Sequence, residues 1–471
     1  MTDTTSHYDL AVLGAGPAGE KASAQAAYFG KKVIVIERER EPGGAAVHTG
    51  TLPSKTLRET ALYLSGYHAR ALYGVAVELN PAATLQHLMS RKEAIAVAES
   101  LSFRENFARH GVDYVEGTAS FVDPHTVRIQ SHAGERRVTA DHVLIATGSK
   151  PHRPADIDFT DEGIHDSDEI LTIQTLPSSL TILGGGVIGC EYACMFAALG
   201  AKVSLVDART EILPFLDFEI IGRLRGAMSR LGINLVQGSR WTTVQRVGDG
   251  IRANLANGGS VTSEQLLFSA GRSGRVDDLA LENAGIQADS RGYIPVDDRF
   301  RTKVPHVLAA GDVIGFPALA SVSMEQGRVA VCHAFGFTYK TAVAAAMPYG
   351  IYTIPEVSSF GETEETCKEK KIPYVVGRAL YANNPRGKIT GDLEGITKLV
   401  IERDSRKVIG VHVIGERASE LVHIGQTVIT LGGRVDTFID MVFNYPTLAD
   451  SYKYAAYDCL RALSGSTQVP V

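Results

Sequence analysis

Two segments of the chain carry glycines with the spacing Gly-x-Gly-x-x-Gly, which is typical of turns that bind dinucleotide phosphates. The first set is Gly14, Gly16 and Gly19, and the second set is Gly184, Gly186 and Gly189. Glycines at these positions allow a tight turn and a close approach of the backbone to a pyrophosphate. The helix that follows such a turn offers N–H groups to the anion. Two such segments in one chain predict two bound dinucleotides and electron transfer between them.

The residues around the first glycine set have the order strand, turn, helix, strand. Residues 8–13 form a short apolar run, residues 18–29 have the small side chains of a packed helix, and residues 33–36 form a second apolar run. Such runs are typical of buried parallel strands. Glu37 closes the second strand, where a carboxylate can accept hydrogen bonds from ribose hydroxyls. The segment therefore predicts a complete dinucleotide-binding unit and not an isolated glycine-rich turn.

The second glycine set has the same surroundings. Residues 180–183 lead into it, residues 190–199 continue as a helix, and residues 202–206 form a strand that ends at Asp207. Asp207 favours the unphosphorylated ribose of NAD, whereas Arg209 could receive the 2′-phosphate of NADP. The sequence leaves both interpretations open, and a site that uses both residues would accept either nucleotide. Arg209 could also be an ordinary surface arginine.

The cysteines give no sign of a disulfide framework or a metal site. They are Cys190, Cys194, Cys332, Cys367 and Cys459, an odd number without Cys-x-x-Cys spacing. Cys190 and Cys194 lie one helical turn apart and could form a ligand pair, but no matching histidine or cysteine follows. We expect them to pack helix against sheet, and we predict no metal. Reduced thiols of this kind are typical of the cytoplasm.

Length and charge narrow the function classes further. The chain has 471 residues, which predicts about three domains at roughly 150 residues each. Its net charge is −6, without long runs of one sign, so nothing indicates nucleic acid or an anionic membrane as a partner. We recognise no signal peptide at the start and no apolar stretch of the ~18 residues that a membrane span needs. We expect a cytoplasmic protein.

Further motifs complete a larger pattern. Three segments, residues 143–148, 267–272 and 307–312, each read as a strand followed by a turn. They place four residues at strand ends, namely Thr147, Gly148, Gly271 and Asp312. Between the first glycine set and these segments the chain also has Gly43, Gly44 and Lys55. Together these motifs resemble those of the two-dinucleotide-binding flavoprotein reductases, such as dihydrolipoamide dehydrogenase, glutathione reductase and mercuric reductase. The resemblance extends from about residue 8 to residue 463.

The resemblance implies an α/β fold with two Rossmann-like domains, one for FAD and one for NAD(P), and a C-terminal α/β dimerisation domain. The FAD domain is expected from residues 1–150 and 275–345, the NAD(P) domain from residues 151–274, and the dimerisation domain from residues 346–471. Residues 56–110 should form long helices under the flavin. Strands are expected within 348–356 and 398–413. A homodimer or a larger homo-oligomer follows from the same resemblance.

The resemblance also implies roles for single residues. Lys55 would lie near flavin N5, paired with Glu191 in the turn 189–191, as the catalytic pair. An ammonium there would stabilise the negative charge that arrives with a hydride. The implied cofactor-binding positions are Gly14, Gly16, Gly19, Glu37, Gly43, Gly44, Thr51, Lys55, Gly117, Thr147, Gly148, Asp312, Ala320, Gly184, Gly186, Ile188, Gly189, Glu191, Asp207, Arg209 and Gly271.

The residues that would carry disulfide chemistry are missing. Ala46 and Thr51 stand where the disulfide reductases have their two redox cysteines, and neither side chain can form a thiolate or a disulfide. Tyr445 replaces the histidine that protonates the leaving thiol, and Asp450 replaces its glutamate. Tyrosine, with a pKa of ~10, is a poor acid–base partner for a thiol near neutral pH. Electrons therefore have no exit through sulfur.

Five segments resemble the soluble (si-specific) pyridine nucleotide transhydrogenases, namely residues 49–55, 166–168, 186–192, 349–356 and 443–447. That family also has the threonine and the tyrosine, but it usually keeps the first cysteine, which is Ala46 here. The resemblance implies FAD as the cofactor and NAD(H) and NADP(H) as substrates. NADPH would give a hydride to flavin N5 and leave, and NAD+ would then take the hydride in the same pocket.

The sequence leaves two alternatives open. The chain could be an NAD(P)H:quinone or dye reductase whose acceptor uses the space vacated at Ala46, or a flavin-dependent binding or structural subunit. His48 and His423 could in principle replace the missing acid or base. Nothing in their spacing supports that role, so we expect hydrogen-bonded structural histidines.

Overall fold

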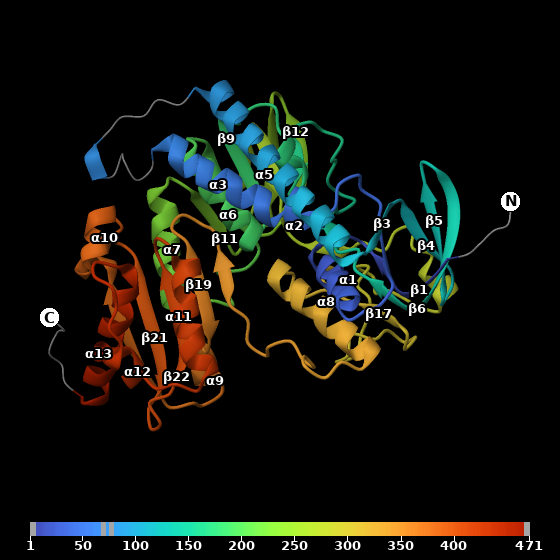
Figure 1. Cartoon of the computed structure of the whole chain (residues 1–471). Helices are drawn as coiled ribbons and strands as arrows, with labels where there is room; N and C mark the ends of the chain where they lie inside the picture. The colour runs from blue at the N-terminus through green and yellow to red at the C-terminus, as the bar shows by residue number, and fades with distance from the viewer. Residues whose placement is uncertain (1–5, 67–71, 75–79, 466–471) are drawn as a thin grey trace.

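The computed structural model describes residues 6–66, 72–74 and 80–465. Three large sheets organise this part of the chain (Figure 1), and helices cover their faces. The sheet nearest the N-terminus lies on one side of the molecule and the C-terminal sheet on the other, with the second glycine unit between and behind them. The α/β fold class expected from the sequence is confirmed.

The first sheet has seven strands, with the order β3-β2-β1-β6-β5-β4 and β17 added to β6. Its strands are β1 (Ser6–Leu13), β2 (Val33–Glu37), β3 (Asp113–Glu116), β4 (Thr118–Asp123), β5 (Thr126–Ser131), β6 (Gly134–Ile145) and β17 (Val307–Ala309). Strand β1 pairs in parallel with β2 and with β6. All residues of β2 are buried, as expected for a parallel strand covered on both faces. Helices α1 (Pro17–Tyr28) and α8 (Ala320–Phe335) pack against each other beside this sheet.

The second sheet repeats this arrangement with the order β11-β10-β9-β15-β8. Its strands are β8 (Ile164–Asp166), β9 (Ser179–Leu183), β10 (Lys202–Asp207), β11 (Asn234–Gln237) and β15 (Gln265–Phe268). Helices α6 (Val187–Ala198) and α7 (Phe218–Arg230) follow β9 and β10. A small antiparallel sheet of β12 (Trp241–Val247), β13 (Gly250–Leu255) and β14 (Ser260–Ser263) lies beside it. Strands β7 (Ser149–Pro151) and β16 (Arg272–Gly274) pair where the chain enters and leaves this unit.

The third sheet is antiparallel in all of its pairs, with the order β18-β19-β22-β21-β20. Its strands are β18 (Tyr349–Ile351), β19 (Val357–Gly361), β20 (Tyr374–Leu380), β21 (Ile396–Glu402) and β22 (Val408–Ile414). The helices of this part are α9 (Glu364–Glu369), α10 (Pro385–Thr390), α11 (Ala418–Thr430), α12 (Asp436–Asp440) and α13 (Ser451–Leu463). The strand predicted within residues 348–356 is short. It comprises only β18, and residues 352–356 form a connection without regular structure to β19.

The long helices expected over residues 56–110 are present in the described part of the chain. Helix α3 (Thr51–Ser65) follows the short helix α2 (Gly44–His48), and α5 (Pro81–His110) packs along α3. Residues 67–71 and 75–79, between α3 and α5, lie outside the described residues. Asn80 caps α5 by accepting a hydrogen bond from the N–H of Ala83. No helix in the described part of the chain has both the length and the apolar character that a membrane span requires.

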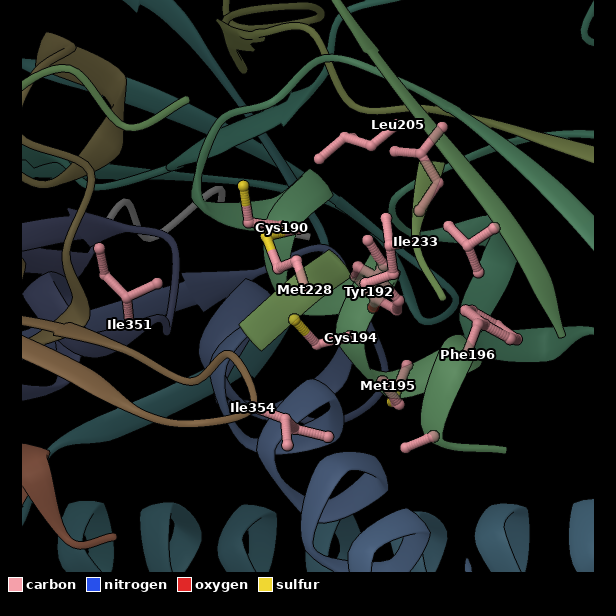
Figure 2. Packing of buried hydrophobic residues seen from close by; sticks show 14 of the residues in the cluster. Cys190, Tyr192, Cys194, Met195, Phe196, Leu205, Met228, Ile233, Ile351 and Ile354 are labelled. Carbon is pink, nitrogen blue, oxygen red and sulfur yellow. The ribbon is translucent and has the colours of Figure 1, made fainter. Parts of the chain in front are cut away.

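Cys190 and Cys194 belong to the largest hydrophobic core, as the sequence predicts. Both side chains are completely buried, among residues such as Met195, Met228 and Ile354 (Figure 2). Burial raises the pKa of the Cys194 thiol to about 12 and that of Cys190 well above its usual value. Both thiols are therefore protonated and unreactive near neutral pH. Among the described residues, no group of three or more potential ligands could hold a metal ion.

Candidate active site

A cleft of about 1270 Å³ extends from the first glycine set to the first turn of α6 and to the start of the third sheet. Residues from α2, α3, α6, α8 and the segment 348–352 line it. The expected cofactor positions that line the cleft are Gly14, Gly16, Glu37, Gly44, Thr51, Lys55, Gly117, Thr147, Gly148, Ile188, Glu191, Gly271, Asp312 and Ala320. Those that lie outside its lining are Gly19, Gly43, Gly184, Gly186, Gly189, Asp207 and Arg209.

Glycines shape the first turn for steric reasons. Gly14 has a φ of 106°, and a Cβ on it would lie 2.5 Å from the carbonyl oxygen of Ala146. A Cβ on Gly19 would lie 1.9 Å from the carbonyl oxygen of Gly14. Only glycine therefore allows helix α1 to start this close to β1. Gly16, at the N-cap of α1, lines the cleft, and a Cβ on it would lie 3.8 Å from the Cα of Gly44.

Glu37 is held by the turn that it faces. One carboxylate oxygen accepts from the N–H of Ala15 at 2.7 Å, and the other accepts from the N–H of Glu39 at 3.0 Å. The side chain is buried at the end of β2 and also lines the cleft. A carboxylate fixed in this way can accept further hydrogen bonds from hydroxyls in the cleft.

Several buried polar atoms along the cleft fit a bound dinucleotide. Among the described residues, the Oγ1 atom of Thr147 and the Nε atom of Arg275 are buried and have no hydrogen-bond partner. Such atoms are rare in native structures unless water or a ligand satisfies them. Asp312 accepts from Ser149 Oγ at 2.9 Å and from Ser323 Oγ at 3.3 Å, and its carboxylate lines the same cleft. The donor set and the narrow glycine turn therefore fit an FAD molecule.

Lys55 and Glu191 form an ion pair beside the cleft. The Nζ atom of Lys55 lies 2.7 Å from Oε2 of Glu191, and the backbone N–H of Tyr352 donates to Oε1 of Glu191 at 2.9 Å. The Lys55 ammonium also lies 4.8 Å from the centre of the Tyr352 ring. The side chain of Glu191 is 8% exposed and that of Lys55 is 24% exposed. Glu191 comes from helix α6 and not from a turn, which corrects the expectation for residues 189–191, because the helix already begins at Val187.

Asp207 and Arg209 form a second ion pair at the end of β10. Nε and Nη2 of Arg209 donate to the two carboxylate oxygens of Asp207 at 2.9 and 2.7 Å. Asp207 also accepts from the N–H groups of Gly185 and Arg209. Burial alone would raise the pKa of Asp207, but the hydrogen bonds from Arg209 and Gly185 outweigh it and lower the pKa. The Arg209 side chain is half exposed, whereas the Asp207 side chain is buried.

No cysteine lines the cleft in the part of the chain that the structure describes. Ala46 and Thr51 both line it, and all five cysteines are buried elsewhere. Tyr445 is exposed on the third-sheet side of the molecule, at 72%, and burial raises the pKa of Asp450. His48 lines the cleft and contacts the carbonyl oxygen of Pro42 through Nε2 at 3.0 Å. His423 contacts Gln426 at 2.7 Å, so both histidines have the expected hydrogen bonds.

Some residues of the cleft were not predicted as site residues from the sequence, among them Arg272, Tyr352 and Phe215. Arg272 donates from Nε to Ser149 Oγ at 2.8 Å, which connects it to Asp312 through that serine. Tyr352 lies over Lys55, and Phe215 lines the cleft from the loop after β10. Arg272 and Tyr352 lie within segments that carry the family resemblance, so both could have been predicted as site residues from those motifs. Phe215 has no local sequence signal, because only packing brings its loop to the cleft.

Comparisons with known proteins agree with this geometry. Residues 8–327 match the family described as pyridine nucleotide-disulphide oxidoreductase, and residues 347–456 match its dimerisation domain. A soluble pyridine nucleotide transhydrogenase of Mycobacterium tuberculosis is 44% identical over 463 residues, which cover 98% of this chain and 99% of the relative. The chain belongs to the soluble pyridine nucleotide transhydrogenases of this oxidoreductase family.

Other soluble pyridine nucleotide transhydrogenases support this membership. The one from Pseudomonas fluorescens is 40% identical over 97% of this chain and 99% of its own length, and the one from Colwellia psychrerythraea is 39% identical over 97% and 98%. Among solved structures, LpdA from M. tuberculosis has a TM-score of 0.87 at 26% identity, covering 96% of this chain and 99% of its own. The HOCl-induced flavoprotein disulfide reductase RclA from Escherichia coli has a TM-score of 0.86 at 25% identity with the same coverage.

Proposed function

We propose that this transhydrogenase catalyses the reaction NADPH + NAD+ = NADP+ + NADH by using one nicotinamide site twice. The observation that carries the proposal is the lining of the cleft, which has the Lys55–Glu191 pair but Ala46 and Thr51 in place of a thiol pair. Without a sulfur relay, a second nicotinamide is the acceptor that the site itself provides. The two couples differ only by a phosphate far from the reacting ring, so cellular nucleotide pools would set the direction.

The first glycine unit and its neighbours would hold FAD. The N-terminus of α1 would face the pyrophosphate, Glu37 the ribose, Thr147 the adenosine side and Asp312 the ribityl chain. FAD, when bound, supplies a ring system that accepts a hydride from one nicotinamide and passes it to another. Gly117 and Ala320 line the same cleft, whereas the role of Gly43 follows only from the family resemblance.

The second glycine unit would bind either nicotinamide nucleotide. The N-terminus of α6 would face its pyrophosphate, with Gly186 at the N-cap position. Asp207 would accept from the ribose of NAD(H), and Arg209 would leave Asp207 to bind the 2′-phosphate of NADP(H). Arg209 would thus bind Asp207 when NAD(H) is present and the 2′-phosphate when NADP(H) is present, so one site would accept both nucleotides.

Lys55 and Glu191 would prepare the reacting end of the cleft. Glu191 is fixed by the N–H of Tyr352 and holds the Lys55 ammonium in place. An ammonium held in advance stabilises negative charge at no cost of reorganisation during the reaction. The pair therefore acts by position and charge, and we assign it no proton transfer to substrate.

We further propose that the chain forms at least a homodimer through a dimerisation domain of residues 346–471. The FAD domain would comprise residues 1–150 and 275–345, and the NAD(P) domain residues 151–274. The match of residues 347–456 to a dimerisation domain supports this assembly. Exposed apolar side chains on that part, such as Leu431, Val442 and Tyr445, would be covered by the second copy. The cytoplasmic location stays a prediction.

Steady-state kinetics of the purified holoprotein test the proposed function. NADPH oxidation is measured with thio-NAD+ and, separately, with menadione as the acceptor. We expect parallel double-reciprocal lines for NADPH and thio-NAD+, because one product leaves before the second substrate binds. Much faster turnover with menadione than with thio-NAD+ would instead favour the quinone reductase, for which the small side chain of Ala46 leaves space in the cleft.

A further inference from the structure

A lysine ammonium is buried between the second glycine unit and the third sheet. The Lys398 side chain, in the middle of β21, is 1% exposed. Its Nζ atom lies 2.7 Å from Oδ1 of Asp217, 2.6 Å from Oε1 of Glu364 and 3.0 Å from Oε2 of Glu219. Burial alone would lower the pKa of Lys398, but Asp217 and the two glutamates outweigh it and raise the pKa. The ammonium is therefore charged and holds three carboxylates together.

Two of these carboxylates come from the nucleotide-binding side. Asp217 is fully buried and caps α7 by accepting from the N–H groups of Glu219 and Ile220. Glu219 lies in the first turn of α7, whereas Glu364 belongs to α9 of the third-sheet part. Figure 1 shows α7 beside the strands of the third sheet. Lys398 thus fastens the start of α7 to β21.

Asp217 also ends the loop that leaves the nucleotide site, which we call the β10–α7 loop (residues 208–217). Arg209 lies at the start of this loop, and the N–H of Leu213 donates to the carbonyl oxygen of Gly185 at 3.4 Å in the glycine turn. Phe215, near its end, lines the cleft and packs against Tyr349 with ring centres 5.1 Å apart. The loop therefore spans from the Asp207–Arg209 pair to the Lys398 anchor.

We propose that Lys398 and Asp217 are positioning residues for nicotinamide nucleotide binding. They fix the far end of the β10–α7 loop to the third sheet, and this places Arg209 and Phe215 for either nucleotide. Neither side chain lines the cleft, so they act through the loop and not by contact. Because this role rests on the proposed function of the second glycine unit, binding is measured apart from turnover in its test.

The test uses holoenzyme of three variants, Asp217→Asn, Lys398→Met and the control Lys370→Met. Asparagine keeps the helix cap and removes one of the three negative charges around the Lys398 ammonium. Lys370 pairs with Glu362 on the surface of the same part of the chain and contacts nothing in the loop. Dissociation constants of NADP+ and NAD+ come from the change in flavin absorbance, with the FAD content and the maximal NADPH oxidation rate measured in parallel.

In Asp217→Asn and Lys398→Met, both dissociation constants should rise about tenfold, a change of about 1.4 kcal/mol. The FAD content and the rate at saturating nucleotide should stay at the native level, and Lys370→Met should match the native protein. Affinities within about twofold of native in Asp217→Asn would overturn the proposal even if Lys398→Met fails to fold. A lower maximal rate with unchanged affinities would overturn it too. A native protein that binds NADP+ but does not reduce NAD+ would refute only the proposed function.

Discussion

The ammonium of Lys55 and the carboxylate of Glu191 lie 2.7 Å apart, although 136 positions separate them in the sequence. Lys55 comes from α3 beside the first glycine unit, and Glu191 comes from α6 directly after the second. The ion pair therefore joins the two glycine units at the cleft. The Tyr352 N–H, from the third-sheet part, adds a further hydrogen bond to Glu191.

Replacing Lys55 by methionine should slow reduction of the holoprotein by NADPH by about 10²-fold, since a fixed charge at the reacting end is lost. Glu191→Gln should slow it less, because the ammonium remains but loses its anionic partner. The rate of anaerobic bleaching measures both effects. Lys370→Met, which changes a surface ion pair with Glu362, serves as the control. A native bleaching rate in Lys55→Met would remove the lysine from its proposed role.

Arg209→Ala should weaken NADPH binding by about 10- to 100-fold, because a hydrogen bond to a charged group contributes about 1.5–3 kcal/mol. NADH binding should change little or improve, since Asp207 loses a competitor. The ratio of the two KM values measures the effect. Arg230→Ala, which breaks a surface contact with Glu394, is the matched control. Equal losses for both nucleotides would count against a phosphate contact by Arg209.

Two glycines of the second turn should respond differently to alanine. A Cβ on Gly186 meets no atom within 4 Å, so Gly186→Ala should keep the native unfolding temperature and FAD content. Its methyl group would obstruct the approach of a pyrophosphate to the turn, so KM for both nucleotides should rise about tenfold or more. A Cβ on Gly189 would lie 1.9 Å from the carbonyl oxygen of Gly184, so Gly189→Ala should instead destabilise the fold. Native KM values in Gly186→Ala would place the pyrophosphate elsewhere.

The free energy of unfolding should fall as the pH drops below about 6.5, because His412 is buried neutral. Its side chain is completely buried, and burial lowers its pKa. The unfolded chain then binds a proton that the folded chain does not, so stability is lost on acidification until the folded pKa is reached. Denaturant unfolding at about pH 7.5 and about pH 5.5 should show a smaller difference for His412→Gln than for the native protein. The exposed His87→Gln should behave as native, and an unchanged pH dependence in His412→Gln would contradict this assignment.

The sequence predicts best what depends on local spacing. The glycines around Gly16 and Gly186, and the acidic residues Glu37 and Asp207 at the strand ends, lie at fixed distances along the chain from the turns they serve. Pairing of Lys55 with Glu191 was accessible only through the family resemblance, since no local pattern relates α3 to α6. The same resemblance is why the sequence alone predicts the α/β fold class.

Long-range packing sets what the sequence alone misses. Lys398 stands among apolar residues of β21 and gives no hint of its three carboxylate partners. Nothing in the sequence distinguishes Phe215 from other apolar loop residues, but its ring packs against that of Tyr349 at the cleft. Both contacts arise where separate units meet, and the spacing within either unit does not encode them.

Anaerobic double-mixing stopped-flow follows hydride transfer from NADPH to NAD+ through the holoprotein. The yellow holoprotein is first mixed with one equivalent of NADPH, and the bleached protein is then mixed with NAD+ or, in a parallel run, with menadione. We expect NAD+ to restore the yellow absorbance at a rate no slower than steady-state turnover and to form one equivalent of NADH. A protein that NADPH bleaches and that NAD+ fails to reoxidise, while menadione restores its colour rapidly, would contradict the proposed transhydrogenase reaction.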